Sequence, residues 1–167
     1  MTLAREVVER LRATGLTVAT GESLTGGLLS AALVDVPGSS LAVRGGVLAY
    51  ATDVKARVLG VDDELLDTGG PVQAEVARQL ARGAARLLGA DCGVGTTGVA
   101  GPGPADGHGA GTVYLAVTLA EEVRTRRLLL AGTRPAVRRA SVTAALALLS
   151  GLLADREQLG RRVRSPQ

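Results

Sequence analysis

The sequence predicts an α/β fold: a three-layer α/β/α sandwich around a mixed, mostly parallel sheet. The first observation is that segments with helical periodicity alternate with short apolar segments, as helices alternate with strands in such folds. The second is that the apolar segments 113–117 and 123–130 lie close together, which indicates a hairpin and makes the sheet mixed. The third is composition: 46% of the 167 residues are hydrophobic, enough for one buried core.

The individual elements follow from these patterns in chain order. Apolar side chains recur at helical spacing over 3–13, and Gly15 ends that helix. A short strand, a Gly-rich turn and an apolar helix come next. Thr133 is expected to cap the last helix, with Pro135 in its first turn. The predicted helices are 3–13, 28–36, 72–88 and 134–153, with short helical turns over 52–67; the predicted strands are 16–20, 43–50, 91–97, 113–117 and 123–130, with a loop at 98–111.

One domain is expected over residues 1–154, followed by a basic tail over residues 155–167. The tail holds four arginines and two acidic residues. Its Arg161-Arg162-Val163-Arg164 segment could contact nucleic acid or an acidic surface, but a solvated chain end is the commoner case.

Composition excludes several classes of function. With two tyrosines and no Phe or Trp, the chain lacks the aromatic side chains on which bases stack, so nucleic-acid binding is not expected. Cys92 and His108 are each alone, which excludes an internal disulfide and a Cys/His metal cluster. The start of the chain has no signal pattern and no apolar run reaches membrane-spanning length. A cytoplasmic protein without a membrane, metal or cofactor requirement is therefore expected.

Lys55 is the only lysine among the 19 Lys and Arg residues. Arginine keeps its proton in proteins, whereas lysine can act as a neutral amine. Lys55 is therefore a candidate for a catalytic base. The alternative is a surface lysine without a function that by chance was not replaced by arginine.

Two Gly-rich segments are candidate binding sites. Gly93-Val94-Gly95-Thr96-Thr97-Gly98 matches the dinucleotide fingerprint, but Gly and Pro follow it where a helix would have to begin, so a Rossmann site is not expected. The segment 22–27 lies between a strand and a helix, where free N–H groups near Thr25 and Gly26 would stabilise an oxyanion beside Ser23. The alternative is that Ser23 or Thr25 merely caps the helix.

A nucleophilic serine needs a base, and two arrangements are conceivable. Ser23 could pair with His108 and Asp106, but the glycines on both sides of His108 hold a base poorly. A neutral lysine is the other option, with Lys55 activating Ser23 and Tyr50 donating or relaying a proton.

Several motifs in a fixed order then indicate a family. The motifs are Glu22-Ser23-Leu24-Thr25-Gly26-Gly27, Pro37-Gly38-Ser39-Ser40, Gly46-Val47-Leu48-Ala49-Tyr50 with Lys55, Gly70-Pro71-Val72, Thr97-Gly98-Val99-Ala100-Gly101-Pro102, Gly111-Thr112-Val113 and Gly132-Thr133-Arg134. By these motifs the chain resembles the CinA C-terminal domain family, the nicotinamide-mononucleotide deamidases, over about residues 3–153.

The resemblance implies an amidohydrolase that converts nicotinamide mononucleotide to nicotinic acid mononucleotide and ammonia, in pyridine-nucleotide salvage. It implies no metal or cofactor, a small nucleotide substrate and a homo-oligomer. The implied catalytic residues are Ser23 as nucleophile, Lys55 as base and Tyr50. The predicted substrate-binding residues are Thr25, Gly26, Gly27, Thr97, Gly98 and Arg134, the last as a phosphate donor.

The sequence also departs from the family pattern. Leu24 stands where cysteine is usual, Gln73 where serine is usual, and Gly107-His108-Gly109-Ala110 replaces a stretch with a Lys-Pro pair. These departures concern substrate fit more than chemistry. An amidase for another small amide and a non-catalytic nucleotide-binding or partner domain therefore stay open as alternatives.

Overall fold

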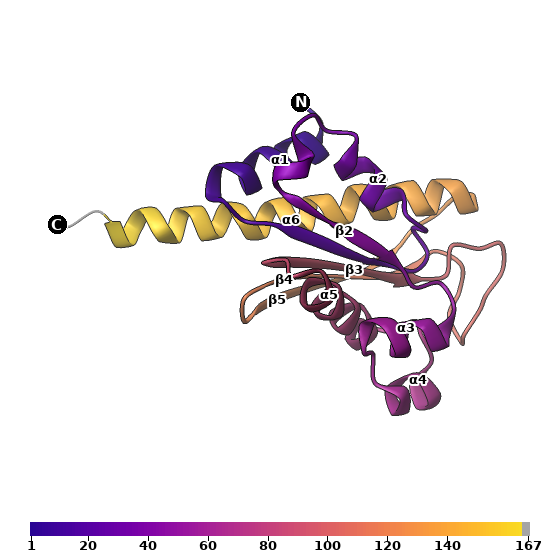
Figure 1. The fold of residues 1–167 in the computed structure, drawn as a ribbon. Helices are drawn as coiled ribbons and strands as arrows, with labels where there is room; N and C mark the ends of the chain where they lie inside the picture. The colour runs from indigo at the N-terminus through magenta and orange to yellow at the C-terminus, as the bar shows by residue number, and fades with distance from the viewer. Residues whose placement is uncertain (165–167) are drawn as a thin grey trace.

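The computed structural model describes the chain over residues 1–164 and its side chains over residues 1–159 (Figure 1). Short connections join helices and strands in an order close to the predicted one. The described elements are α1 (Leu3–Thr14), β1 (Val18–Glu22), α2 (Leu28–Val34), η1 (Ser39–Leu41), β2 (Val43–Leu48), α3 (Thr52–Leu59), α4 (Asp63–Gly69), α5 (Ala74–Leu88), β3 (Cys92–Gly98), β4 (Thr112–Leu119), β5 (Glu122–Leu129) and α6 (Arg134–Arg164).

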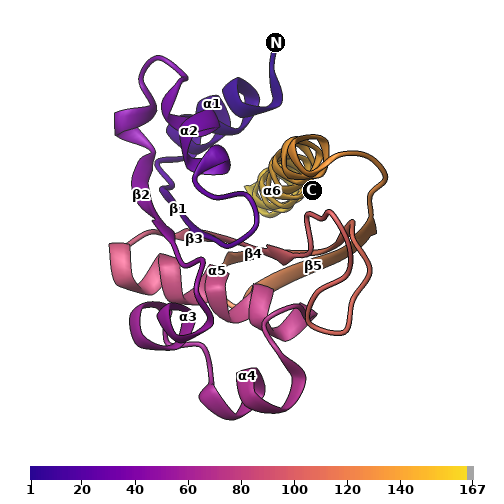
Figure 2. The ribbon, with the colours of Figure 1, turned by 90° about the vertical axis from the view of Figure 1, so that its right-hand side faces the viewer.

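The three-layer arrangement is confirmed. Helices α1, α2 and α6 cover one face of the sheet, and α3, α4 and α5 lie on the other (Figure 2). The main core fills the first interface, with Leu11, Leu29, Leu115 and Leu149 among its buried side chains. A smaller core fills the second around Leu59, buried against α5.

The sheet is mixed, as predicted, with strand order β2-β1-β3-β4-β5 in the described part of the chain. Strand β1 pairs in parallel with β2 and β3, whereas β3 with β4 and β4 with β5 are antiparallel. The expectation of a mostly parallel sheet therefore holds only for the β2-β1-β3 half. For β4 and β5 the physical reason is the short connection: only Ala120 and Glu121 join them, whereas a parallel pair would need a crossover of a dozen or more residues.

Strand β1 ends later than predicted, because Gly21 and Glu22 belong to the strand rather than to the turn. The Glu22 carboxylate accepts hydrogen bonds from the backbone N–H groups of Gly27, Leu29 and Ser30 at 2.7–3.1 Å. Glu22 therefore ties the end of the strand to the start of α2. Helix α2 in turn ends at Val34, two residues before the predicted end.

The glycines of β3 have a packing role, which explains the apparent dinucleotide fingerprint. A Cβ on Gly93 would lie 2.0 Å from the Ala81 carbonyl oxygen, and one on Gly95 would lie 2.0 Å from that of Ala77. Both acceptors belong to α5, so the backbones of α5 and β3 are in close contact. The glycines let this helix pack onto the sheet, and this packing accounts for the spacing of Gly93 and Gly95.

Gly95→Ala is expected to destabilise the fold by about 3 kcal/mol, because the clash is with backbone atoms that cannot rotate away. Gly151→Ala is the matched control: it lies in α6 with no atom within 4 Å of its added Cβ. That variant should be neutral or more stable by up to about 1 kcal/mol. Urea unfolding measures both, and equal stability of the two variants would contradict the packing role.

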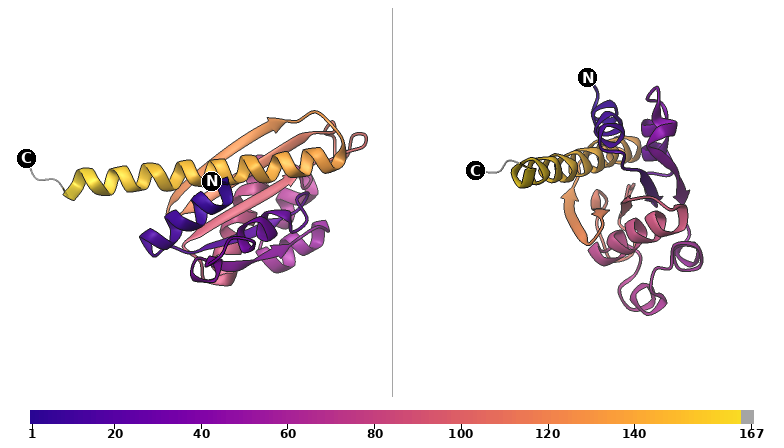
Figure 3. Two further views of the ribbon diagram at one scale, coloured as in Figure 1. Left: turned by 90° about the horizontal axis from the view of Figure 1, so that it is seen from above. Right: turned by 60° about the vertical axis from the view of Figure 1, so that its left-hand side comes forward.

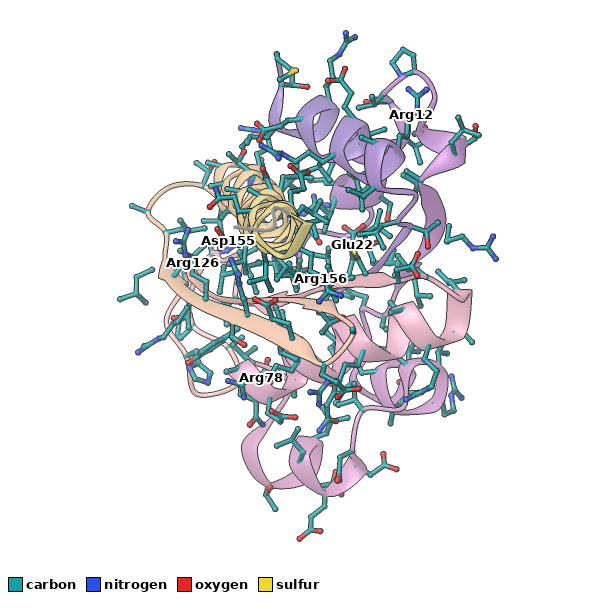
Figure 4. The ribbon with its side chains drawn as sticks, turned by 90° about the vertical axis from the view of Figure 1, so that its left-hand side faces the viewer. Arg12, Glu22, Arg78, Arg126, Asp155 and Arg156 are labelled. Carbon is teal, nitrogen blue, oxygen red and sulfur yellow. The ribbon has the colours of Figure 1, made fainter. Side chains whose placement is uncertain are left out.

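Helix α6 begins directly after Thr133, as predicted, but it runs on to Arg164 instead of ending near Leu153. Its later turns extend past the sheet (Figure 3). Asp155 points toward β5 in Figure 4 and pairs with Arg124 at 2.8 Å, while Glu157 pairs with Arg10 of α1 at 2.9 Å. The helix is continuous across the predicted boundary at 154, and the predicted tail lies partly outside the described residues.

By length and composition, residues 134–159 of α6 would suffice to cross a membrane. One side of this helix is buried against α1, α2 and β4, with Leu149 and Leu152 fully covered. That packing is typical of the core helix of a globular domain.

Candidate functional site

A pocket of about 290 Å³ lies where the carboxyl ends of β1, β2 and β3 meet. Parallel strands end at the same edge of a sheet, so residues far apart in sequence gather there. Of the predicted site residues, Ser23, Tyr50, Lys55, Thr97, Gly98 and Arg134 line this pocket. The other lining residues are Leu24, Thr52, Pro71, Val72 and Val99 to Asp106.

Lys55, in α3, is only 1% exposed. Its Nζ atom donates hydrogen bonds to the carbonyl oxygens of Ala49 at 2.9 Å and Tyr50 at 2.8 Å. Burial lowers the pKa of Lys55, because desolvation disfavours the ammonium form, and the charges of Asp106 and Asp53 oppose this effect. The only lysine of the chain is thus held inside the pocket with its pKa moved toward neutrality.

Arg134 and Tyr50 form a pair across the pocket. One terminal nitrogen of the Arg134 guanidinium donates to the Tyr50 hydroxyl at 2.9 Å, and the other donates to the carbonyl oxygen of Gly101 at 2.8 Å. Because Tyr50 accepts this bond, its own hydroxyl proton is free for a ligand. The tyrosine is 60% exposed, so a ligand can reach it.

Ser23 follows directly after β1 and is 8% exposed. Its backbone N–H donates to the Thr96 carbonyl oxygen at 3.0 Å, which continues the parallel pairing by one residue. The next two carbonyls, of Leu24 and Thr25, accept hydrogen bonds from the Arg138 guanidinium at 2.9 and 2.8 Å. The turn that carries Ser23 is therefore fixed by both β3 and α6.

The structure does not bring Thr25, Gly26 and Gly27 to the pocket. Thr25 is fully buried, with its hydroxyl 2.8 Å from that of Thr96. The Gly26 N–H donates to the Ser23 carbonyl oxygen, and the Gly27 N–H donates to Glu22. Of the predicted oxyanion donors, the Gly26 N–H is thus engaged within the turn, and the buried Glu22 carboxylate takes up N–H groups at the start of α2.

Thr97 and Gly98 end β3 at the pocket wall. The Thr97 hydroxyl donates to the carbonyl oxygen of Pro71 at 2.6 Å. This bond holds the extended segment before α5 against the sheet, so α5 begins at Ala74 rather than at the predicted Val72. Val72 is left to line the pocket.

His108 lies apart from Ser23. Its ring packs edge-on against Tyr114 of β4, with ring centroids 6.2 Å apart, and it is not among the pocket residues. The arrangement of Ser23, His108 and Asp106 as a triad therefore has no support.

Asp106 itself lines the pocket. The sequence signal that could have found it is the Asp106-Gly107 pair, which is typical of a tight hairpin turn.

Comparison with known proteins decides the family. The family model described as the CinA C-terminal domain matches residues 1–153. The chain belongs to the CinA C-terminal domain family. It is 46% identical over 138 residues to a CinA-like protein of Frankia casuarinae, which covers 83% of this chain and 32% of that protein. A putative competence-damage inducible protein of Geobacillus kaustophilus is 43% identical, over 92% of this chain and 38% of its own length.

Solved CinA-type structures have the same fold. A CinA superfamily protein from Klebsiella pneumoniae gives a TM-score of 0.88 at 34% identity, covering 92% of this chain and 96% of that one. The competence/damage inducible protein CihA from Agrobacterium tumefaciens gives 0.87 at 37% identity, over 90% and 93%. This CinA-type chain spans about a third of the length of the curated relatives given above. The names of these two relatives specify no reaction.

Proposed function

We propose that this domain hydrolyses the carboxamide of nicotinamide mononucleotide to nicotinic acid mononucleotide and ammonia. The observation that carries the proposal is the buried Lys55 amine in the same pocket as Ser23. A serine hydroxyl attacks an amide only when a base takes its proton. In this pocket, whose lining holds no histidine, Lys55 is the side chain suited to that role.

The contacts of Lys55 support its use as a base. A neutral amine has two N–H groups and one lone pair. With its N–H groups donated to the carbonyls of Ala49 and Tyr50, the lone pair is left for a proton from the pocket. The lowered pKa of Lys55 makes this neutral form accessible nearer to physiological pH.

The proposed reaction has two steps. Ser23 Oγ attacks the carboxamide carbon while its proton moves to Lys55, which then gives that proton to the departing ammonia and leaves an ester on Ser23. A water molecule then attacks the ester and gives a proton to Lys55, which passes it to Ser23 Oγ as the ester C–O bond breaks and the acid leaves. The Tyr50 hydroxyl proton, free because Arg134 donates to its oxygen, supplies a hydrogen bond to the developing negative charge or to the leaving group.

Arg134 is suited to the phosphate of the substrate. Two of its five N–H groups are committed to Tyr50 and Gly101, which leaves donors for an anion and fixes the guanidinium in place. The proposal also includes a cytoplasmic homo-oligomer that acts on a small nucleotide, without metal or cofactor and without a role for nucleic acid or membranes.

Comparing nicotinamide mononucleotide with nicotinamide riboside, which lacks the phosphate, tests the substrate assignment. Arg134→Ala should lower kcat/KM for the mononucleotide by roughly 10- to 100-fold, through loss of a charge-assisted contact. The riboside should lose much less. The matched control is Arg139→Ala, an exposed arginine on α6 that does not line the pocket. Ammonia release is the readout, and equal losses for both substrates would contradict a phosphate contact.

A further inference from the structure

Asp106 occupies the tip of a small hairpin inside the long loop between β3 and β4. The backbones of Ala105 and His108 exchange two hydrogen bonds, at 3.0 and 2.9 Å. The two residues between them, Asp106 and Gly107, have φ angles of 50° and 75°. Positive φ at both central positions defines a type I′ turn, in which Asp-Gly is a favoured pair. The carboxylate is therefore mounted on a defined turn.

This turn brings Asp106 to the wall of the pocket that Ser23, Lys55 and Arg134 also line. Its Cβ lies 3.8 Å from the position of a Cβ on Gly70, so the hairpin tip rests against the connection before α5. None of the ion pairs found among residues 1–159 involves Asp106. Asp106 thus lines the pocket without an ion-pair partner among these residues, although its charge acts on Lys55.

The pocket lining then carries two fixed charges of opposite sign. If Lys55 works as a neutral amine, the fixed charges of the lining are the Asp106 carboxylate and the Arg134 guanidinium. The two come from different elements, one from the loop hairpin and the other from the start of α6. Such a pocket is complementary to a ligand that carries one positive and one negative charge.

We propose that Asp106 recognises the positive charge of the pyridinium ring, so that the pocket selects carboxamides carried on a cationic aromatic ring. This inference rests on the proposed function and deepens it, because it names the chemical feature that separates the substrate from other small amides. Arg134 binds the phosphate, and Asp106 binds the ring that carries the reacting carboxamide.

The same contact links recognition to chemistry. The Asp106 charge raises the pKa of Lys55, against the larger effect of burial. A ring cation beside Asp106 compensates that charge and adds a repulsive one near the Lys55 amine. Both effects favour the neutral form of Lys55 once the substrate is bound.

The test compares nicotinamide mononucleotide with its 1,4-dihydro form, which has the same phosphate and nearly the same shape but an uncharged ring. Dissociation constants are measured by calorimetry in a Ser23→Ala background, where no turnover occurs. We expect a preference of about tenfold for the charged ring, as for one ion pair in a partly hydrated pocket. Asp106→Asn should reduce it to about twofold by weakening the charged ligand alone. Asn tolerates the same positive φ, so the turn persists.

The matched control is Asp53→Asn. Asp53 also lies near Lys55, but it pairs with Arg57 at 3.3 Å and does not line the pocket. This variant should keep the full preference. An unchanged preference in Asp106→Asn, an equal loss in Asp53→Asn or no binding of either nucleotide would each overturn the inference. Ammonia release by the unmodified chain is measured separately: a ring-charge preference that depends on Asp106, without hydrolysis, would support the recognition and refute the proposed reaction.

Discussion

Lys55→Arg is expected to lower kcat/KM for nicotinamide mononucleotide by roughly 100- to 10,000-fold, nearly as much as Lys55→Ala. Arginine keeps a positive charge and can donate hydrogen bonds, but it cannot accept a proton at any working pH. The two roles open to a pocket lysine, proton transfer and electrostatic binding, are therefore separated by this one substitution. Steady-state ammonia release measures the effect.

The pH dependence of the same reaction follows from the lowered pKa of Lys55. Below that pKa the amine is protonated and cannot act as a base, so kcat/KM is low; it rises as the pH passes through the pKa. The ionisation should fall below the value of about 10.4 for free lysine. His108→Ala should keep this profile, because His108 packs on Tyr114 away from the pocket. Near-normal activity of Lys55→Arg would remove Lys55 as the base.

Ser23→Ala is expected to reduce kcat by about a thousandfold or more while the fold and the affinity for the substrate change little. The backbone of the turn is held by the Ser23 N–H on β3 and by Arg138 on the next two carbonyls, and none of these bonds uses the hydroxyl. Alanine therefore removes the nucleophile without releasing the turn. Single-turnover ammonia release and calorimetric binding separate the two properties. A variant that keeps more than about a tenth of the activity would exclude Ser23 as the nucleophile.

Lys55 was expected as the single lysine, and Thr97 only from the family resemblance; the structure supplies the reason why they meet Ser23. Ser23 follows β1, Lys55 lies in the short helix after β2, and Thr97 is near the end of β3, so the parallel order of these strands brings them to one edge. The helix positions, the hairpin and the mixed sheet also followed from periodicity. The turn of Asp106 carried a local signal, but its place beside Lys55 depends on how a long loop folds back, which no periodicity encodes.

At the start of α2 the structure differs from the expectation of free N–H groups, for a physical reason. A glycine-rich strand-to-helix turn offers free N–H groups, and the sequence contains no local sign that another group already uses them. In the structure the buried carboxylate of Glu22, one residue before Ser23, accepts hydrogen bonds from the N–H groups of Gly27, Leu29 and Ser30. Glu22 makes this contact because it is the last residue of β1 and does not belong to the turn.

The most direct test of the account is the product formed when the purified chain is incubated with nicotinamide mononucleotide in the presence of a chelator. Ammonia and nicotinic acid mononucleotide should form in equal amounts, with no added metal or cofactor, and neither product should exceed background with Ser23→Ala. If the chain binds the mononucleotide but leaves its carboxamide intact, or hydrolyses it equally well without the Ser23 hydroxyl, the account of this pocket as a serine–lysine amidohydrolase is contradicted.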